Sequence, residues 1–394
     1  QTIRILEGVI NSKNITLKLE EIKNIEFRGE SVFCNRLIHI FEENEYYAFK
    51  DIIIQYSNTE WFKPKNFVHF TKKISKYNPR SHKIGIKQYN SLLKEVSNRN
   101  TIAKHAFYPL IHYTIKERRY KKGLKKRRWR GIKIKRRHIN FATHIDTHIY
   151  SYYAKVLLGA KYENFLSKTR YNECVIAYRK ILKKKDKNGE NKHKANMDFA
   201  QDVFDYISKQ NDCVVITLDI TKFFDNLNHS LLYKAWTSLL QEERLPSADW
   251  NIYKAITNFS FVDEADLLKE FNIKNKRELR QKNIHCYCKT PKEFRERVVK
   301  KGLIKKCVRV DDENRFKGIP QGTAISAFLS NLYLLKFDED FFNYTKEQDM
   351  FLYRRYSDDI LIVCSKEKYK NILEYIKKKL DEEFYLKINP QKTQ

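Results

Sequence analysis

The chain has 394 residues, with 78 Lys or Arg against 48 Asp or Glu, so its formal net charge is +30. A hydrophobic content of 42% and an aromatic content of 14% supply enough apolar side chains for a large buried core, which excludes a wholly disordered protein. A surplus of this size predicts a polyanionic partner. Because only 10 glycines and 7 prolines interrupt the chain, helices are favoured.

The N-terminal part is expected to be an accessory region covering residues 1–100. Its runs at 8–19 and 51–56 are typical of strands, whereas 86–96 has helical spacing. Apolar residues recur at helical spacing again between 145 and 157 and between 197 and 208. We assign no function to residues 1–100 from these patterns.

Positive charge is concentrated between residues 101 and 140, where 15 Lys or Arg stand against one acid, Glu117. Interleaved aromatic rings can stack on bases, so this stretch, and 116–137 in particular, is predicted to bind nucleic acid. A solvated basic loop is the alternative, but so many adjacent like charges repel unless they are neutralised. The predicted nucleic-acid-binding residues are Lys121, Lys122, Lys125, Lys126, Arg127, Arg128, Trp129 and Arg130.

Neither a run of about 18 apolar residues nor a signal-peptide pattern is present, so we expect a cytoplasmic protein that makes no membrane contact. Seven scattered cysteines fit reduced thiols in that compartment. Cys286, Cys288 and Cys307 could be read as a zinc group. The C-x-C spacing is not the usual one for zinc ligands, however, and ordinary buried cysteines are favoured.

Acidic residues follow apolar runs at two places in the second half of the chain. The run 213–218 predicts a strand that ends at Asp219, followed by a capped helix over 231–240. After a helix predicted over 324–337, strands at 351–353 and 360–364 flank a turn with Asp358 and Asp359. Three carboxylates at strand ends can converge on two Mg²⁺ ions, although each motif alone is also typical of turns and helix caps.

Four motifs occur in a fixed order: LDITKFFDNL at 218–227, KGIPQGTAIS at 317–326, RYSDDILIV at 355–363 and LKINPQKT at 386–393. This series resembles motifs A, B, C and D in the palm of reverse transcriptases. The resemblance implies an α+β, helix-rich right-hand polymerase fold with fingers and palm, in which an antiparallel palm sheet packs on helices. The fingers would then span 101–212 and the palm 213–394, with an insertion at about 262–312. We expect the thumb to lie outside this chain.

The resemblance also assigns the metal site. Asp219 and Asp358 would bind both Mg²⁺ ions, for which Mn²⁺ can substitute, while Asp359 is the weaker ligand and the backbone of Ile220 completes the coordination. These three aspartates are the implied catalytic residues.

For the incoming dNTP, the resemblance implies an aromatic residue that excludes the ribose 2′-OH. Phe224 is favoured for this gate, with Phe223 as the alternative. Lys392 would neutralise or protonate the leaving pyrophosphate. The remaining implied dNTP-binding residues are Arg137, Arg136, Gln321 and Gly322.

Ser357 in motif C and the string THIDTHIYSYY at 143–153 look most like bacterial defence-associated reverse transcriptases of the former unknown groups, perhaps type 3 among them. The implied function is RNA-directed DNA synthesis in antiphage defence, templated by a noncoding RNA, with a homo-oligomer or a second defence protein as a further partner. Template-independent or protein-primed DNA synthesis is the first alternative. A non-catalytic RNA-binding scaffold is disfavoured, because all three aspartates and Gln321 are present.

Overall fold

The computed structural model describes residues 61–62, 67–71, 86–120, 132–183, 192–346, 351–390 and 392–393. The strands predicted at 8–19 and 51–56 and the basic segment 121–130 lie outside the described residues. Helices and mostly antiparallel strands occur along the described chain, in agreement with the predicted α+β class. Among the described residues, no helix is both long enough and apolar enough to cross a membrane.

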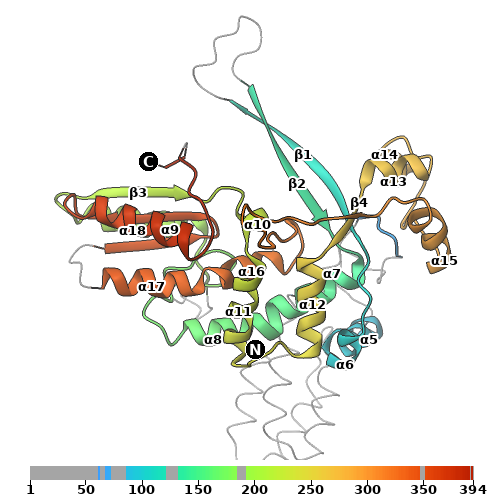
Figure 1. The fold of residues 1–394 in the computed structure, drawn as a ribbon, viewed down its shortest axis with the longest axis horizontal. Helices are drawn as coiled ribbons and strands as arrows, with labels where there is room; N and C mark the ends of the chain where they lie inside the picture. Colours follow the sequence, from blue (N-terminus) through green and yellow to red (C-terminus); the bar gives the residue numbers. More distant parts are fainter. Residues whose placement is uncertain are drawn as a thin grey trace, which may run out of the picture.

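A three-stranded antiparallel sheet forms the half of the molecule drawn at the left of Figure 1. Its strands are β3 (Val214–Asp219), β7 (Asp359–Cys364) and β6 (Phe351–Tyr356), with β7 in the middle. Side chains alternate between the two faces, so one face is apolar and packs on α17 (Leu335–Thr345) and α18 (Tyr369–Glu382) in the main core. The opposite face carries the acidic strand ends and is only partly covered, by α9 (Asn196–Ile207).

A long hairpin projects from the other half of the molecule (Figure 1). It consists of β1 (Leu110–Tyr120) and β2 (Ile132–Phe141), paired in register from Ile111 with Phe141 to Tyr120 with Ile132. The pairing places Tyr120 and Ile132, the described residues on either side of the basic segment 121–130, opposite each other.

The base of the hairpin is widened by strands from the predicted insertion. β4 (Ser260–Asp263) runs parallel to β1, and β5 (Lys305–Lys306) pairs with β4. A second core cluster packs there, and it includes Ile111, Val262 and Cys288. The insertion's short helices, which contribute to this cluster or flank it, are α13 (Glu264–Glu270), α14 (Lys276–Gln281), α15 (Pro291–Phe294) and the π-helix η3 (Arg295–Val299).

Helices connect the sheet and the hairpin through the main core. The helical spacing predicted between 145 and 157 is confirmed, but it is realised as an α-helix that ends at Tyr152 and a π-helical turn that follows it, and a further α-helix continues from Leu158. The connecting helices are α5 (Ile86–Ser97), α6 (Arg99–Ala103), α7 (His144–Tyr152), η2 (Tyr153–Leu157), α8 (Leu158–Leu166), α11 (His229–Leu240), α12 (Ser247–Thr257) and α16 (Ser326–Tyr333).

The single helix predicted over 324–337 is wrong in its extent. α16 begins at Ser326 and ends at Tyr333, and α17 begins at Leu335. Leu334 adopts φ −93° and ψ 8°, which lies outside the helical region and breaks the helix there.

A fully buried ion pair joins α17 to β6. The guanidinium of Arg355 donates to both carboxylate oxygens of Asp338, at 2.7 and 2.6 Å, and neither side chain is exposed. Tyr353 also donates to Asp338, at 2.5 Å, and Arg355 donates to the carbonyl of Ser357 at 3.1 Å. This network therefore fixes the turn that carries Asp358 and Asp359.

We expect Asp338→Ala to destabilise the fold by about 3–5 kcal/mol, because Arg355 would be left buried and uncompensated. Asp212→Ala is the matched control, since it removes the exposed ion pair with Lys366 and should cost no more than about 1 kcal/mol. Urea unfolding of both variants measures the difference. Equal losses would contradict a structural role for the buried pair.

Candidate active site

Three carboxylates meet at adjoining ends of the palm sheet. Asp219 is the last residue of β3 and Asp359 the first residue of β7, and the two are cross-strand partners. Asp358 lies in the turn before β7, and its carbonyl accepts a hydrogen bond from the backbone N–H of Ile220 at 3.2 Å. Ser357 makes this turn possible by adopting a positive φ of 58°.

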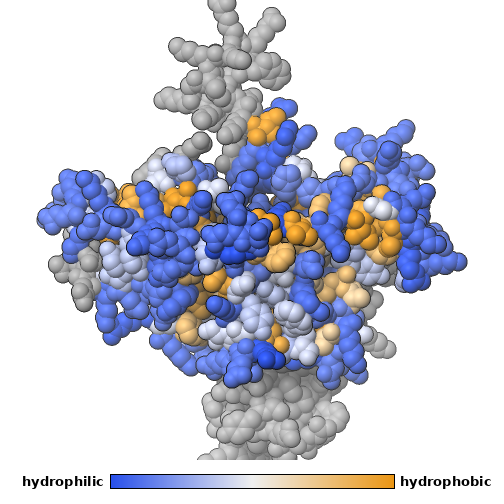
Figure 2. Space-filling model, in the orientation of Figure 1, coloured by the Kyte–Doolittle hydropathy of each residue, from blue (hydrophilic) through white to orange (hydrophobic). Residues whose placement is uncertain are grey.

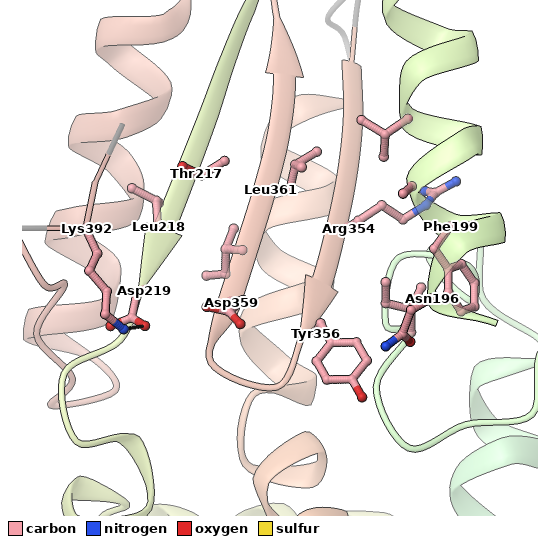
Figure 3. Close-up of a pocket in the computed structure, with 14 residues that line it drawn as sticks. Asn196, Phe199, Thr217, Leu218, Asp219, Arg354, Tyr356, Asp359, Leu361 and Lys392 are labelled. Atoms are coloured by element: carbon pink, nitrogen blue, oxygen red, sulfur yellow. Dashed lines mark hydrogen bonds and ion pairs between the residues drawn. The ribbon is translucent and has the colours of Figure 1, made fainter. Parts of the chain in front are cut away.

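The segment after α18 brings a cation to this cluster. Ile388 forms a β-bridge with Ile220, and the N–H of Asn389 donates to the carbonyl of Asp219 at 2.7 Å. As a result the ammonium of Lys392 contacts the carboxylate of Asp219, as Figure 3 shows. The amide of Asn389 donates to the other oxygen of Asp219 at 3.2 Å.

The carboxylates disfavour one another's charge. Burial raises the pKa of Asp358, and the charges of Asp359 and Asp219 raise it further. Burial and the charge of Asp219 likewise raise the pKa of Asp359, while the cations of Lys392 and Lys135 oppose this shift. The site therefore holds more negative charge than its own residues neutralise.

The two candidate gate residues lie in different environments. Phe223 is only 2% exposed and belongs to the main core. Phe224 is half-buried, and its carbonyl accepts a hydrogen bond from Ile319 at 2.9 Å. Of the two rings, Phe224 is therefore the more accessible. Asp225, the next residue, forms an ion pair with Arg309 at 2.6 Å.

The loop with Gln321 and Gly322 packs against the edge of the hairpin. The N–H of Asn140 on β2 donates to the carbonyl of Gln321 at 2.8 Å. Gly322 has a φ of 114°, and a Cβ there would lie 2.6 Å from the carbonyl oxygen of Asn140. Only glycine permits this close approach, so this loop forms the contact between fingers and palm.

The two arginines predicted for the triphosphate lie on opposite faces of β2, because side chains alternate along a strand. Arg137 shares its face with Lys135 and Glu117, and it pairs with Glu117 at 3.0 Å. Arg136 points to the other face and is exposed. Since Lys135 lowers the pKa of Asp359, the face of Lys135 and Arg137 is the one nearer the carboxylates.

A cavity of about 450 Å³ opens on the acidic face of the sheet (Figure 3). Asp219, Asp359 and Lys392 line one part of it, and Tyr356 and Asn196 line another. Asp219 and Asp359 therefore border a space that opens between the sheet and α9.

Residues 121–394 match the family described as Reverse transcriptase (RNA-dependent DNA polymerase). The chain belongs to the reverse transcriptase family. No curated protein matches its sequence.

Solved telomerase structures resemble this reverse transcriptase chain at low identity. Apo telomerase from Candida tropicalis, truncated from the C-terminal domain, has a TM-score of 0.42 and 12% identity, with 80% of this chain and 57% of that chain covered. Telomerase from Candida albicans with the TWJ fragment of telomeric RNA has a TM-score of 0.40 and 13% identity, with 78% and 45% covered. The chain thus spans about half the length of these relatives.

Reverse transcriptase domains use divalent metal ions, and the donor set here fits them. No three His, Cys, Asp or Glu side chains form a ready-made metal group in the described ranges. The aspartates nevertheless supply hard oxygen donors. Burial, and then the neighbouring carboxylates, raise the pKa values of Asp358 and Asp359, and a bound cation would offset both effects. Cys307 packs against the main core whereas Cys288 lies in the second cluster, so these cysteines are divided between two cores.

Lys135 is the site residue that sequence reasoning missed. Its position two residues before Arg137 on a strand was the available signal, because residues i and i+2 share a face. The roles of all the predicted site residues remain predictions, and the structure brings Lys392 to Asp219 and Gln321 to the fingers. The segment 121–130 lies outside the described residues.

We expect Asp358→Asn to raise the thermal stability of the metal-free protein at neutral pH. Because the folded state raises the pKa of Asp358 above its ordinary value of 3.8, ionisation costs stability as the pH rises through that higher pKa. The gain should disappear below about pH 4, where the carboxyl is protonated in both states. Melting curves from pH 3.5 to 7.5 measure it, and a loss of stability at pH 7 would contradict the repulsion.

Proposed function

We propose that the protein is an RNA-directed DNA polymerase that adds dNTPs to a 3′-OH with two Mg²⁺ ions. The observation that carries the proposal is the meeting of Asp219, Asp358 and Asp359 at adjoining strand ends, within a chain of the reverse transcriptase family. These side chains, with the backbone of Ile220, would hold the ions, and Mn²⁺ could replace Mg²⁺. When bound, such ions activate the attacking oxygen and stabilise the leaving one.

The chain's own residues would act on the triphosphate from two sides. Lys135 and Arg137 on β2 offer cations from the fingers, and Lys392 offers one from the palm. Lys392 already contacts Asp219, so it can pass to the leaving pyrophosphate and neutralise or protonate it there. Phe224, the half-buried gate ring, would meet the 2′ position of the sugar and favour dNTPs over rNTPs.

RNA is the proposed template, bound along the hairpin and the insertion. The hairpin joins the basic segment 121–130 to the fingers. The insertion adds exposed cations that form no ion pair with the described residues, among them Arg277, Arg280, Lys289, Lys292, Arg295, Lys300, Lys301 and Lys306. Neutralising so many charges favours a polyanion with many phosphates.

We further propose a bacterial, cytoplasmic enzyme that copies a dedicated noncoding RNA in antiphage defence. Support for this comes from the motif C sequence and the string at 143–153. Template-independent or protein-primed synthesis on the same fold is the competing function. Sequencing of the DNA made from the copurified nucleic acid separates the two, since templated products repeat the complement of the RNA.

We expect Asp219→Asn to reduce dNTP incorporation on a primed RNA template to background, because each ion of the pair depends on this carboxylate. Binding of the template should persist, since the basic surfaces are built from other residues. Primer extension and filter binding measure the two effects. Asn211→Asp, which adds an exposed carboxylate instead of removing one, is the control. Retained activity in Asp219→Asn would contradict the proposed function.

Lys135→Ala should lower kcat/KM for dNTPs about tenfold, mainly through KM, because a cation facing the triphosphate is lost. Arg136→Ala removes a neighbouring charge from the opposite face and should change KM for dNTPs less than twofold. Steady-state kinetics at saturating primer and template compare them. If Arg136→Ala has the larger effect on KM, the assignment of the faces is wrong.

A further inference from the structure

A second cavity lies apart from the active site, between α11, α12 and the loop 307–316. Its volume is about 660 Å³, which is within the range of about 300–1,000 Å³ found for small-molecule sites. It shares no lining residue with the cavity beside Asp219. The residues that the polymerase function uses therefore leave this cavity unexplained.

The charges that line this cavity are all positive. Four cationic residues, and neither Asp nor Glu, are among its lining residues: Lys234, Lys254, Arg309 and Arg315. Both arginines are already paired, Arg309 with Asp225 and Arg315 with Asp311. Lys234 and Lys254 are exposed and form no ion pair with the described residues, although the ammonium of Lys254 lies 5.8 Å from the centroid of the Trp250 ring. Both lysines therefore present positive charge without an anionic partner to one space. Such a lining attracts an anion.

Aromatic rings stand beside these cations, and two of them are open to solvent. Trp250 is 42% exposed and stacks on Tyr253, with ring centroids 5.5 Å apart and an interplanar angle of 17°. Phe316 is 60% exposed and lies nearly parallel to His229, at 8° and 6.5 Å. A ring that is supported from behind by a second ring is a firm platform for a planar ligand.

Exposed apolar residues gather in patches between hydrophilic ones on the visible face of the molecule (Figure 2). Within the loop 307–316, Val308, Val310 and Phe316 are all exposed. Exposed apolar side chains grouped beside cations that have no anionic partner mark a surface suited to a ligand with both a planar apolar part and an anionic part.

We infer that this cavity binds a nucleotide unit, a phosphate ester that carries a nucleobase, either as a free nucleotide or as one residue of a single strand. The ammonium groups of Lys234 and Lys254 contact the phosphate, and the ring of Trp250 or Phe316 stacks on the base. Arg309 connects the cavity to motif A, because it pairs with Asp225, which follows the gate residue Phe224. An ion pair therefore links the lining of this cavity to the segment that carries Phe224.

The test uses the full chain in EDTA, which prevents metal-dependent dNTP binding by the aspartates. The probes are dATP, a thymidine trinucleotide and a uridine trinucleotide, measured by equilibrium dialysis. The double variant Lys234→Ala/Lys254→Ala should bind the preferred probe at least about tenfold more weakly, as expected for lost charged hydrogen bonds. Trp250→Leu should lose about tenfold through the missing stacking.

Lys370→Ala/Lys377→Ala is the matched control, because it removes two exposed lysines from α18, outside the cavity. It should leave binding within twofold of the parent protein. A trinucleotide with 5-iodouracil should crosslink to the peptides that contain Trp250 or Phe316, which distinguishes this site from the hairpin.

Equal affinity for dATP and the trinucleotides would assign a free nucleotide to the cavity, whereas binding of the trinucleotides alone would assign a strand. Either result supports the inference. Unchanged binding in the lysine double variant, an equal loss in the control, or crosslinks confined to other peptides would overturn it. Because Lys234 and Lys254 are exposed, this variant should fold even if Trp250→Leu does not. None of these readouts depends on polymerase activity.

Discussion

Mutual repulsion among three carboxylates at one end of a sheet is the constraint on which the surrounding structure depends. Asp219 and Asp359 face each other only because β3 and β7 pair in one register. The buried residues Ile216, Ile360 and Ile362 fix that register, since a slip by one residue would turn the apolar set toward solvent. Hydrophobic burial on one face thus holds together charges on the other face that would separate if free.

Two further contacts hold the carboxylates in this arrangement despite their repulsion. From below, the buried pair of Arg355 and Asp338 ties the turn to α17 through the carbonyl of Ser357. From the side, the bridge between Ile220 and Ile388 brings Lys392 to the carboxylate of Asp219. Because Arg355 bonds both Asp338 on α17 and the carbonyl of Ser357, a change in α17 can shift Asp358 and Asp359 without contacting them.

Local patterns predicted those parts of the site that depend on neighbouring residues. The apolar run before Asp219 correctly predicted a strand end, and the two strand-like runs around Asp358 correctly predicted a turn. Both signals lie within a few residues of the feature that they predict. The break at Leu334 gave no signal, since apolar spacing continues across it. The pairing of Arg309 with Asp225 could not be predicted either, because it joins residues 84 positions apart.

The orientation of the hairpin relative to the aspartates also depends on a contact between residues that are distant in the sequence. Alternation along β2 places Lys135 and Arg137 on one face, but only the contact between Gly322 and Asn140 decides that this face lies near the aspartates. Lys135 then acts on Asp359, so cations of the fingers and anions of the palm partly neutralise each other across this contact. Under the proposed function, a substrate that carries both phosphates and divalent ions would supply each side with a closer partner. The unbalanced charges of the unliganded fold would then attract that substrate into the space between fingers and palm.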